Sequence, residues 1–148
     1  PQLLVAPVDL KKVIDDAVIT ANGNIVVSGE PVRIDADEEE IYKVILNLLL
    51  NAVEASQNGS AVQVGYGLHA DMACVKVQDS GSGMSSDFIA NRLFKPFETT
   101  KKHGFGIGLY QCKQIVESHN GNISVVSKEG EGTVFTLLLP AVPEMATD

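Results

Sequence analysis

One stretch of the chain, from Asp37 to about Gln57, constrains the fold more than any other part of the sequence. Its apolar side chains recur at helical spacing, and one face of the predicted helix carries Ile41, Val44, Ile45, Leu48, Ala52 and Ala55. Asp37 with Glu40 three residues later resembles a capping box, which is typical of a helix start. A helix with such a wide apolar stripe is stable only when another layer covers that stripe. We therefore predict a long helix that packs against the core of the domain.

The same helix carries a second stripe, which is polar and includes two asparagines one turn apart. This stripe consists of Glu40, Lys43, Asn47, Asn51, Glu54 and Asn58. One interpretation is a solvated face. The second is the floor of a pocket, because the flanking Leu49, Leu50 and Val53 are too apolar to suit open solvent. An asparagine oxygen can bind a hard cation such as Mg²⁺, and its NH₂ group can donate to a phosphate.

The remaining segments predict a mixture of helices and strands. Further helices are expected over residues 7–20, with Asp9 as N-cap, over residues 106–119, and briefly after Ser85. Apolar alternation predicts strands over residues 24–29, 32–37, 61–70, 73–79, 123–128 and 133–139, the first two joined by a turn at 28–31. This mixture predicts an α+β fold, a two-layer α/β sandwich in which about three helices cover one face of a mixed, mostly antiparallel sheet. We expect one domain over residues 1–148, with a loose tail from residue 141.

Charge and cysteine content exclude several classes of protein. The formal net charge is −8, which argues against a nucleic-acid partner or contact with an anionic membrane. The chain has no signal-peptide pattern and no apolar run long enough to span a bilayer, so we expect a cytoplasmic domain and leave a membrane anchor on a longer parent open. Cys74 and Cys112 are isolated, and we expect reduced thiols in preference to a disulfide.

Glycine-rich loops are the most informative polar segments. The sequence "DSGSGM" puts Asp79 at the end of a predicted strand, followed by Gly81 and Gly83. Glycines at alternate positions let a backbone approach a flat ligand, and an aspartate there can accept from an exocyclic amine. An ordinary Asp-Gly turn explains this loop equally well. The sequence "GEGTVF", with Thr133 at the start of a strand, is by itself an ordinary hairpin turn.

A second loop, "KKHGFGIGLY", runs directly into a predicted helix. Its glycines alternate at Gly104, Gly106 and Gly108, and Lys101 and Lys102 stand just upstream. Backbone N–H groups at a helix start bind anions, and the two lysines supply positive charge. The spacing does not match a dinucleotide-binding G-x-G-x-x-G, and no G-x-x-x-x-G-K-[ST] occurs. A flexible linker would not need such strict alternation, so we predict a phosphate-binding loop.

In chain order, five segments resemble the characteristic boxes of one family. "NLLLNAVEA", "DSGSGM", "LFKPFETTK", "GFGIGL" and "GEGT" are similar to the N, G1, F, G2 and last glycine boxes of the catalytic and ATP-binding domain of sensor histidine kinases, in the GHKL superfamily. The resemblance covers residues 7–140. The sequences "NAVEA" and "PFETTK" are most similar to those of the nitrogen-regulation (NtrB-like) group. It implies binding of ATP and Mg²⁺, a mobile ATP lid, and γ-phosphoryl transfer to a histidine.

That histidine is expected on a separate dimerisation helix pair, which this chain does not contain. His69, His103 and His119 lie in no phosphoacceptor pattern, so they are interpreted as structural or incidental. The resemblance implies a fragment that binds ATP without phosphorylating itself and that is monomeric. The partners it implies are the missing dimerisation helices and, through the parent protein, a response regulator.

The resemblance also implies roles for the polar residues. Asn51 would coordinate Mg²⁺. Asn47 would contact metal-bound phosphate or water and, with Lys101, serve catalysis. Asp79 would accept from the adenine amino group, and Thr133 would hold Asp79 through a hydrogen bond or a water. The remaining nucleotide-binding positions implied are Gly81, Gly83, Met84, Lys102, Gly104, Gly106, Gly108 and Leu109, with Phe94 and Phe97 anchoring the lid.

Two positions depart from the family pattern, and three rival functions are considered. Many members carry a basic residue where this chain has Glu54, and a small residue where it has Phe105. The first rival is an ATP-hydrolysing relative, but such enzymes carry a glutamate in place of Asn47, and asparagine cannot act as a general base. The second is a non-catalytic nucleotide-sensing module. The third is a serine kinase of the anti-sigma type.

Overall fold

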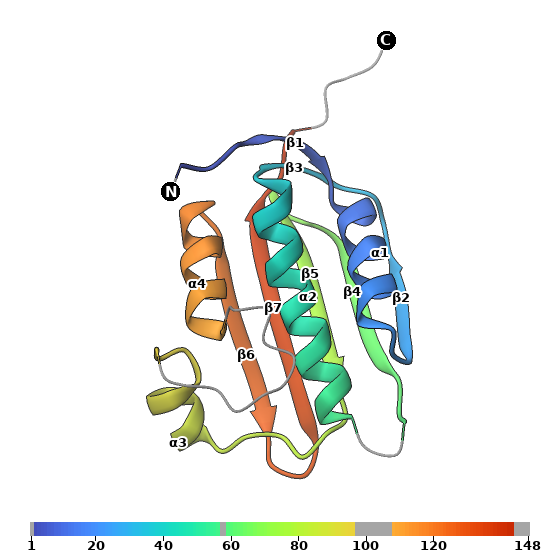
Figure 1. The fold of residues 1–148 in the computed structure, drawn as a ribbon, viewed down its shortest axis with the longest axis vertical. Coiled ribbons are helices and arrows are strands. Elements are labelled where there is room, and N and C mark those ends of the chain that lie inside the picture. The colour runs from blue at the N-terminus through green and yellow to red at the C-terminus, as the bar shows by residue number, and fades with distance from the viewer. Residues whose placement is uncertain (1, 57–58, 97–107, 144–148) are drawn as a thin grey trace.

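The computed structural model describes residues 2–56, 59–96 and 108–143. It contains a five-stranded sheet with helices on one face, as Figure 1 shows. The helices are α1 (Leu10–Ala21), α2 (Glu38–Ala55), α3 (Ser86–Phe88), a π-helical turn η1 (Ile89–Leu93) and α4 (Leu109–Ser118). The strands are β1 (Ala6–Asp9), β2 (Ile25–Gly29), β3 (Arg33–Ala36), β4 (Val62–His69), β5 (Met72–Asp79), β6 (Asn122–Lys128) and β7 (Gly132–Pro140). The predicted α+β sandwich is confirmed.

The sheet is mixed and mostly antiparallel, as predicted. Its strand order is β2-β4-β5-β7-β6, in which β2 and β4 run parallel and the remaining neighbours antiparallel. The predicted strands at 24–29 and 32–37 both form, but they do not pair with each other. β2 joins β4 in the large sheet, whereas β3 pairs with β1 in a separate two-stranded sheet. A turn signal predicts a reversal of the chain and not the partner of each strand, which depends on distant contacts.

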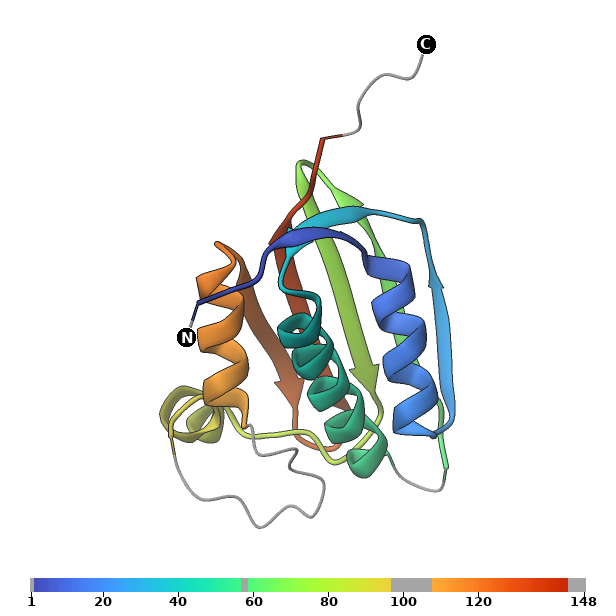
Figure 2. The same ribbon diagram turned by 45° about the horizontal axis from the view of Figure 1, so that its top comes forward.

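Helices α1, α2 and α4 cover one face of the sheet, which Figure 2 shows from a second angle. The cap predicted at Asp9 is confirmed, because its side chain accepts from the N–H of Lys11. The apolar stripe of α2 is fully buried at Ile41, Val44, Ile45 and Leu48, each 0% exposed. Complete burial of such a side chain contributes about 1.5–3 kcal/mol. This packing fixes which face of α2 remains available for the asparagines.

The two ends of the sandwich differ in character. α2 begins beside the β1–β3 ribbon and ends near the β6–β7 hairpin and the loop after β5 (Figure 1). Its 18 residues correspond to a length of about 27 Å at 1.5 Å per residue. The end of β7 lies beside β3, at the same end of the sandwich as the start of α2. Within the described residues, no helix is long and apolar enough to cross a membrane.

The tail is predicted to be loose from residue 141, but the structure shows that its first residues are held. The N–H of Ala141 donates to the carbonyl of Asp71, and the N–H of Val142 donates to the carbonyl of Arg33 at 2.8 Å. These bonds extend the end of β7 toward β3, since Ala141 also forms a bridge with Ile34. Residues 144–148 lie outside the described part of the chain.

Candidate functional site

The two asparagines of α2 lie beside each other and are linked. The Nδ2 of Asn51 donates to the Oδ1 of Asn47 at 3.0 Å, and Asn47 is only 8% exposed. The fully solvated interpretation of the polar stripe is therefore wrong for Asn47. The donor in this bond is the amide nitrogen of Asn51. The carbonyl oxygen of an asparagine side chain is the atom type that Mg²⁺ prefers. Amide orientations of this kind are assigned from the hydrogen-bond network.

The stripe is more exposed on either side of the asparagines. Glu54 is exposed, and the ammonium of Lys43 lies 3.7 Å from the carboxylate of Glu40. A surface ion pair of this type contributes little to stability. With the acidic Glu54 about one turn after Asn51, the positive charge on this face of α2 comes from Lys43.

Asp79 ends β5 and is 6% exposed. Its Oδ1 accepts from the N–H of Gly81 at 2.8 Å. This bond turns the chain sharply after the strand and fixes the orientation of the carboxylate. A buried carboxylate needs such partners, because burial without them is costly. Asp79 is therefore a fixed acceptor at the end of the sheet.

Two glycines of the loop after β5 are required by the packing. A Cβ atom on Gly81 would lie 2.3 Å from the carbonyl oxygen of Ala55, at the end of α2. Gly83 has a φ of +72°, and its Cβ would lie 2.1 Å from the carbonyl oxygen of Lys128. Only glycine fits either position. The loop is therefore pressed between the end of α2, one turn after Asn51, and the β6–β7 hairpin.

Thr133 is the register partner of Asp79, and its hydroxyl contacts a residue on the opposite neighbouring strand. Thr133 and Asp79 are register partners on β7 and β5, and Thr133 is in turn the partner of Ser127 on β6. The hydroxyl groups of Thr133 and Ser127 are 2.8 Å apart. Ser127 also accepts from the N–H of Met84 at 2.8 Å, so it ties the loop to the hairpin. Three polar side chains thus form one row across three strands.

Ser127 is not among the residues predicted for the site, although the sequence contains a signal for it. Ile123, Val125 and Ser127 alternate along β6, and Ile123 is buried. A polar residue that continues the buried face of a strand to its end is unusual, because its hydroxyl needs partners there. The sequence does not predict the partners of this hydroxyl, since they depend on the register of β6 against β7.

Helix α4 begins at the predicted glycine loop. The side chain of Gln111 accepts from the N–H of Gly108 at 2.6 Å, which caps the helix start. One of the backbone donors predicted for phosphate therefore already has a partner. Nearby, the ammonium of Lys113 lies 5.4 Å from the ring centroid of Phe94, a cation–π contact that joins α4 to the end of η1. Leu109, also predicted to line the site, is half-buried against the core.

Several predicted site residues lie outside the described part of the chain. These residues are Phe97, Lys101, Lys102, Gly104 and Gly106, and His103 and Phe105 belong to the same segment. The predicted ATP lid and its phosphate contacts fall in the same segment. They remain predictions.

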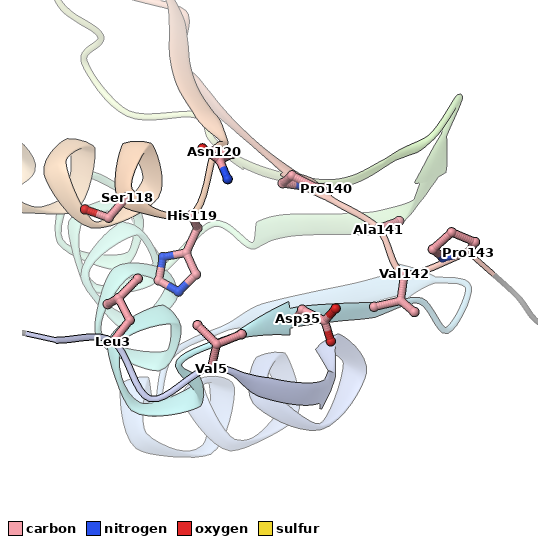
Figure 3. Close-up of a pocket in the computed structure, with 10 residues that line it drawn as sticks. All are labelled: Leu3, Val5, Asp35, Ser118, His119, Asn120, Pro140, Ala141, Val142 and Pro143. Carbon is pink, nitrogen blue, oxygen red and sulfur yellow. The ribbon is translucent and has the colours of Figure 1, made fainter.

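A further buried polar residue, His119, follows α4 and lies beside the start of α2. Its Nε2 accepts from the N–H of Asp37 at 3.0 Å, and its Nδ1 lies 2.8 Å from the carbonyl of Ile115. The ring is therefore neutral with the proton on Nδ1, a structural role in line with the interpretation of the histidines. A hollow of about 290 Å³ beside it is lined by Leu3, Val5, Pro140 and neighbouring residues (Figure 3). Both nitrogens of His119 are already used, so this histidine offers the hollow no catalytic group.

Comparison with known proteins establishes the family. Residues 36–143 match the family described as Histidine kinase-, DNA gyrase B-, and HSP90-like ATPase, and the chain belongs to it. It is 35% identical over 107 residues to Sporulation kinase C of Bacillus subtilis (strain 168), covering 72% of this chain and 25% of that protein. It is 40% identical over 108 residues to sensor histidine kinase ZraS of Escherichia coli (strain K12), covering 73% of this chain and 23% of that protein. The chain thus spans about a quarter of the length of these curated relatives.

Solved structures agree with this assignment. The fold matches a mycobacterial sensor histidine kinase, MprB, with a TM-score of 0.82 and 26% identity over 95% of this chain and all of that one. It matches the catalytic domain of histidine kinase ThkA with a TM-score of 0.80 and 27% identity, over 93% of this chain and 96% of that one. The resemblance to histidine kinase catalytic domains is therefore confirmed. The nitrogen-regulation subgroup remains a prediction.

Proposed function

We propose that this chain is the ATP-binding catalytic domain of a sensor histidine kinase, which binds Mg-ATP and presents its γ-phosphoryl group to a histidine on a separate pair of dimerisation helices. The observation that carries the proposal is the buried, fixed carboxylate of Asp79 beside Thr133, in a chain of this family. A buried carboxylate acceptor suits the exocyclic amine of adenine. The glycine-enforced approach of the loop to Ala55 connects this subsite to the asparagine-bearing turn of α2.

The residues of α2 fit a Mg²⁺ ion that is bound mainly through the nucleotide. Mg²⁺ retains several waters and commonly takes only one or two protein ligands together with substrate phosphates. Asn51 has a suitable carboxamide oxygen, and among the described residues no cluster of three His, Cys, Asp or Glu side chains offers a rival site. When bound, the ion would neutralise charge on the phosphates during transfer. Asn47 would then orient Asn51 through the bond that already joins them.

Asn47 also separates the proposal from ATP hydrolysis. A carboxamide cannot take a proton from water at neutral pH, so it cannot act as the general base of a hydrolase. Phosphoryl transfer to a histidine needs positioning and charge neutralisation, which asparagines can support. The wider setting follows from the same proposal: a cytoplasmic domain, joined in the parent chain to its dimerisation helices, that serves a response regulator. Lys101 and Lys102 would contact the outer phosphates.

The proposal is tested by titrating the purified chain with ATP, with and without Mg²⁺, while released phosphate is counted in the same sample. Asp79→Asn removes the carboxylate while preserving its size, and we expect at least about a tenfold loss of affinity, since about 1.4 kcal/mol corresponds to a factor of ten. Asp71→Asn, at an exposed turn, is the matched control and should bind as the unmodified chain does.

Each outcome of the titration has a clear meaning. Binding that depends on Asp79, tightens with Mg²⁺ and releases almost no phosphate supports a kinase domain that lacks its histidine. Steady phosphate release would instead indicate a hydrolase and contradict the role given to Asn47. No binding would leave a non-catalytic module that has retained the fold.

A further inference from the structure

The hydroxyl of Ser127 has three partners beside the proposed base subsite. Its Oγ lies 2.8 Å from the N of Met84, 2.9 Å from the O of Gly132 and 2.8 Å from the Oγ1 of Thr133. A serine hydroxyl has one proton and two acceptor lone pairs. All three contacts can be hydrogen bonds at once only in one arrangement of protons.

That arrangement follows from the chemistry of the partners. The backbone N–H of Met84 can only donate, so it occupies one lone pair of Ser127. The carbonyl of Gly132 can only accept, so it receives the single proton of Ser127. The third contact is then a hydrogen bond only if Thr133 donates its own proton to Ser127. The hydroxyl of Thr133 is therefore an acceptor toward every further group that it meets.

The position of Thr133 makes this restriction relevant to ligand recognition. Ser127, Thr133 and Asp79 are successive register partners across β6, β7 and β5, with Thr133 and Asp79 both buried. Cross-strand partners on one face lie about 4.5–5.5 Å apart at Cβ. The row thus puts a carboxylate acceptor and a hydroxyl acceptor side by side at the end of the sheet.

We infer that Ser127 is a specificity-determining residue, which selects a 6-amino purine over a 6-oxo purine by holding the Thr133 hydroxyl as an acceptor. This inference rests on the proposed function, in which Asp79 faces the base. The 6-amino group of a purine can donate to these acceptors. A 6-oxo group is itself an acceptor, so it would leave the Asp79 carboxylate and the Thr133 hydroxyl without a donor. Ser127 acts through Thr133 and touches no ligand itself, so it is a positioning residue.

The test compares ATP with inosine triphosphate, which carries an oxo group in place of the 6-amino group. Dissociation constants for both are measured by titration of the unmodified chain and of Ser127→Ala. Without Ser127, the Thr133 hydroxyl can rotate and donate to the oxo group. We expect the preference for ATP to fall by roughly tenfold, the factor that one hydrogen bond of about 1.4 kcal/mol represents.

Three further variants make the test specific. Ser124→Ala removes an exposed hydroxyl from the same strand and should leave the preference unchanged. Ser127→Thr retains the hydroxyl and should preserve the preference. In a Thr133→Val background, Ser127→Ala should no longer alter the preference, because the group through which it acts is absent. If Ser127→Ala does not fold, Ser127→Cys offers a side chain of similar size whose sulfur is a weak acceptor, and the preference should fall in the same direction.

The outcomes distinguish this inference from the proposed function. A loss of preference in Ser127→Ala that Ser127→Thr restores supports the inference. Equal weakening of both nucleotides would show that Ser127 only stabilises the loop, and it would overturn the inference while leaving the proposed function intact. If the unmodified chain binds neither nucleotide, the proposed function fails and the inference fails with it.

Discussion

At the scale of single residues, four buried polar side chains stand out within the part of the chain that the structure describes. Asn47, Asp79, His119 and Thr133 are each at most 8% exposed. Burial of a polar group is costly unless it is hydrogen-bonded, so each marks a position where structure or function requires it. The sequence predicts nucleotide-binding roles for Asn47, Asp79 and Thr133. It predicts a structural or incidental role for His119, and the bonds of this histidine to Asp37 and Ile115 explain its burial.

Gly81 gives a prediction at this scale. In Gly81→Ala, the new methyl group would meet the carbonyl of Ala55 at 2.3 Å, so the loop or the end of α2 must shift. We expect a loss of about 1–3 kcal/mol in the free energy of unfolding, the usual cost of overpacking. ATP affinity should fall as well. Urea denaturation and the ATP titration measure the two effects.

Gly65→Ala is the matched control for this change. A Cβ atom there would meet nothing within 4 Å. Its effect should be neutral or stabilising by up to about 1 kcal/mol, because alanine restricts the unfolded chain. Equal effects at both glycines would contradict the account of Gly81.

At the scale of elements, the start of α2 connects three segments of the chain. Asp37 caps the helix by accepting from the N–H of Glu40 at 3.2 Å, and its second carboxylate oxygen accepts from the N–H of Leu4 at 3.0 Å. Its own N–H donates to His119, at the end of α4. The predicted cap is confirmed. The reciprocal bond of a capping box is replaced by a bond to the imidazole of His119. No local sequence pattern predicts this bond, because His119 is 82 residues away.

The charge of Asp37 predicts a specific dependence on pH. The hydrogen bond from Leu4 is the main cause that lowers the pKa of Asp37 below its ordinary value of 3.8. A lowered pKa means that the carboxylate stabilises the fold above that value, and that this stability is lost as the pH falls through the lower folded-state pKa. Asp37→Asn retains a capping oxygen but does not titrate. The unmodified chain should therefore be the more stable of the two at about pH 6, where the carboxylate is fully charged, and the difference should shrink below pH 3.8.

Denaturation of both chains across this pH range measures the effect. Asp35→Asn removes one negative charge two residues away and corrects for a general effect of net charge. A difference between Asp37→Asn and the unmodified chain that stays constant with pH would contradict the role of the carboxylate.

At the scale of the whole molecule, the two ends of the sandwich have different roles. One end contains contacts that stabilise the fold, and the other contains the proposed site. The β1–β3 ribbon and the start of α2 lie at one end, and the loop after β5 lies at the opposite one (Figure 1). The first end includes Asp37, the N-cap of α2, with its partner His119, and the second includes Asp79, the last residue of β5. Helix α2 spans both ends. A change at the first end should therefore affect stability without a matching change in ligand binding.

His119→Phe tests this separation. The ring is replaced by one of similar shape, but the N–H of Asp37 and the carbonyl of Ile115 lose their partner. We expect a loss of about 1–3 kcal/mol in the free energy of unfolding, the cost of buried groups without hydrogen bonds. At a temperature where the variant is folded, its ATP dissociation constant should change less than about twofold, a free-energy difference well under about 1 kcal/mol.

His69→Gln, at an exposed strand end, is the control and should stay within about 0.5 kcal/mol of the unmodified chain. A large loss of ATP affinity in folded His119→Phe would show that the two ends are coupled through α2 or α4.

Local patterns in the sequence predict the elements, and the same patterns name the residues of the proposed site. Local periodicity predicts the apolar stripe of α2, the cap at Asp37 and the alternation along the strands, because each is a property of residues close together in the sequence. The order of the glycine loops indicated the family. Three features became visible in the folded chain alone: β2 and β3 enter different sheets, His119 replaces half of a capping box, and Ser127 joins Thr133 and Asp79 in one row. These features depend on strand register and helix packing between distant segments, which are set by the burial of whole faces and not by any local pattern.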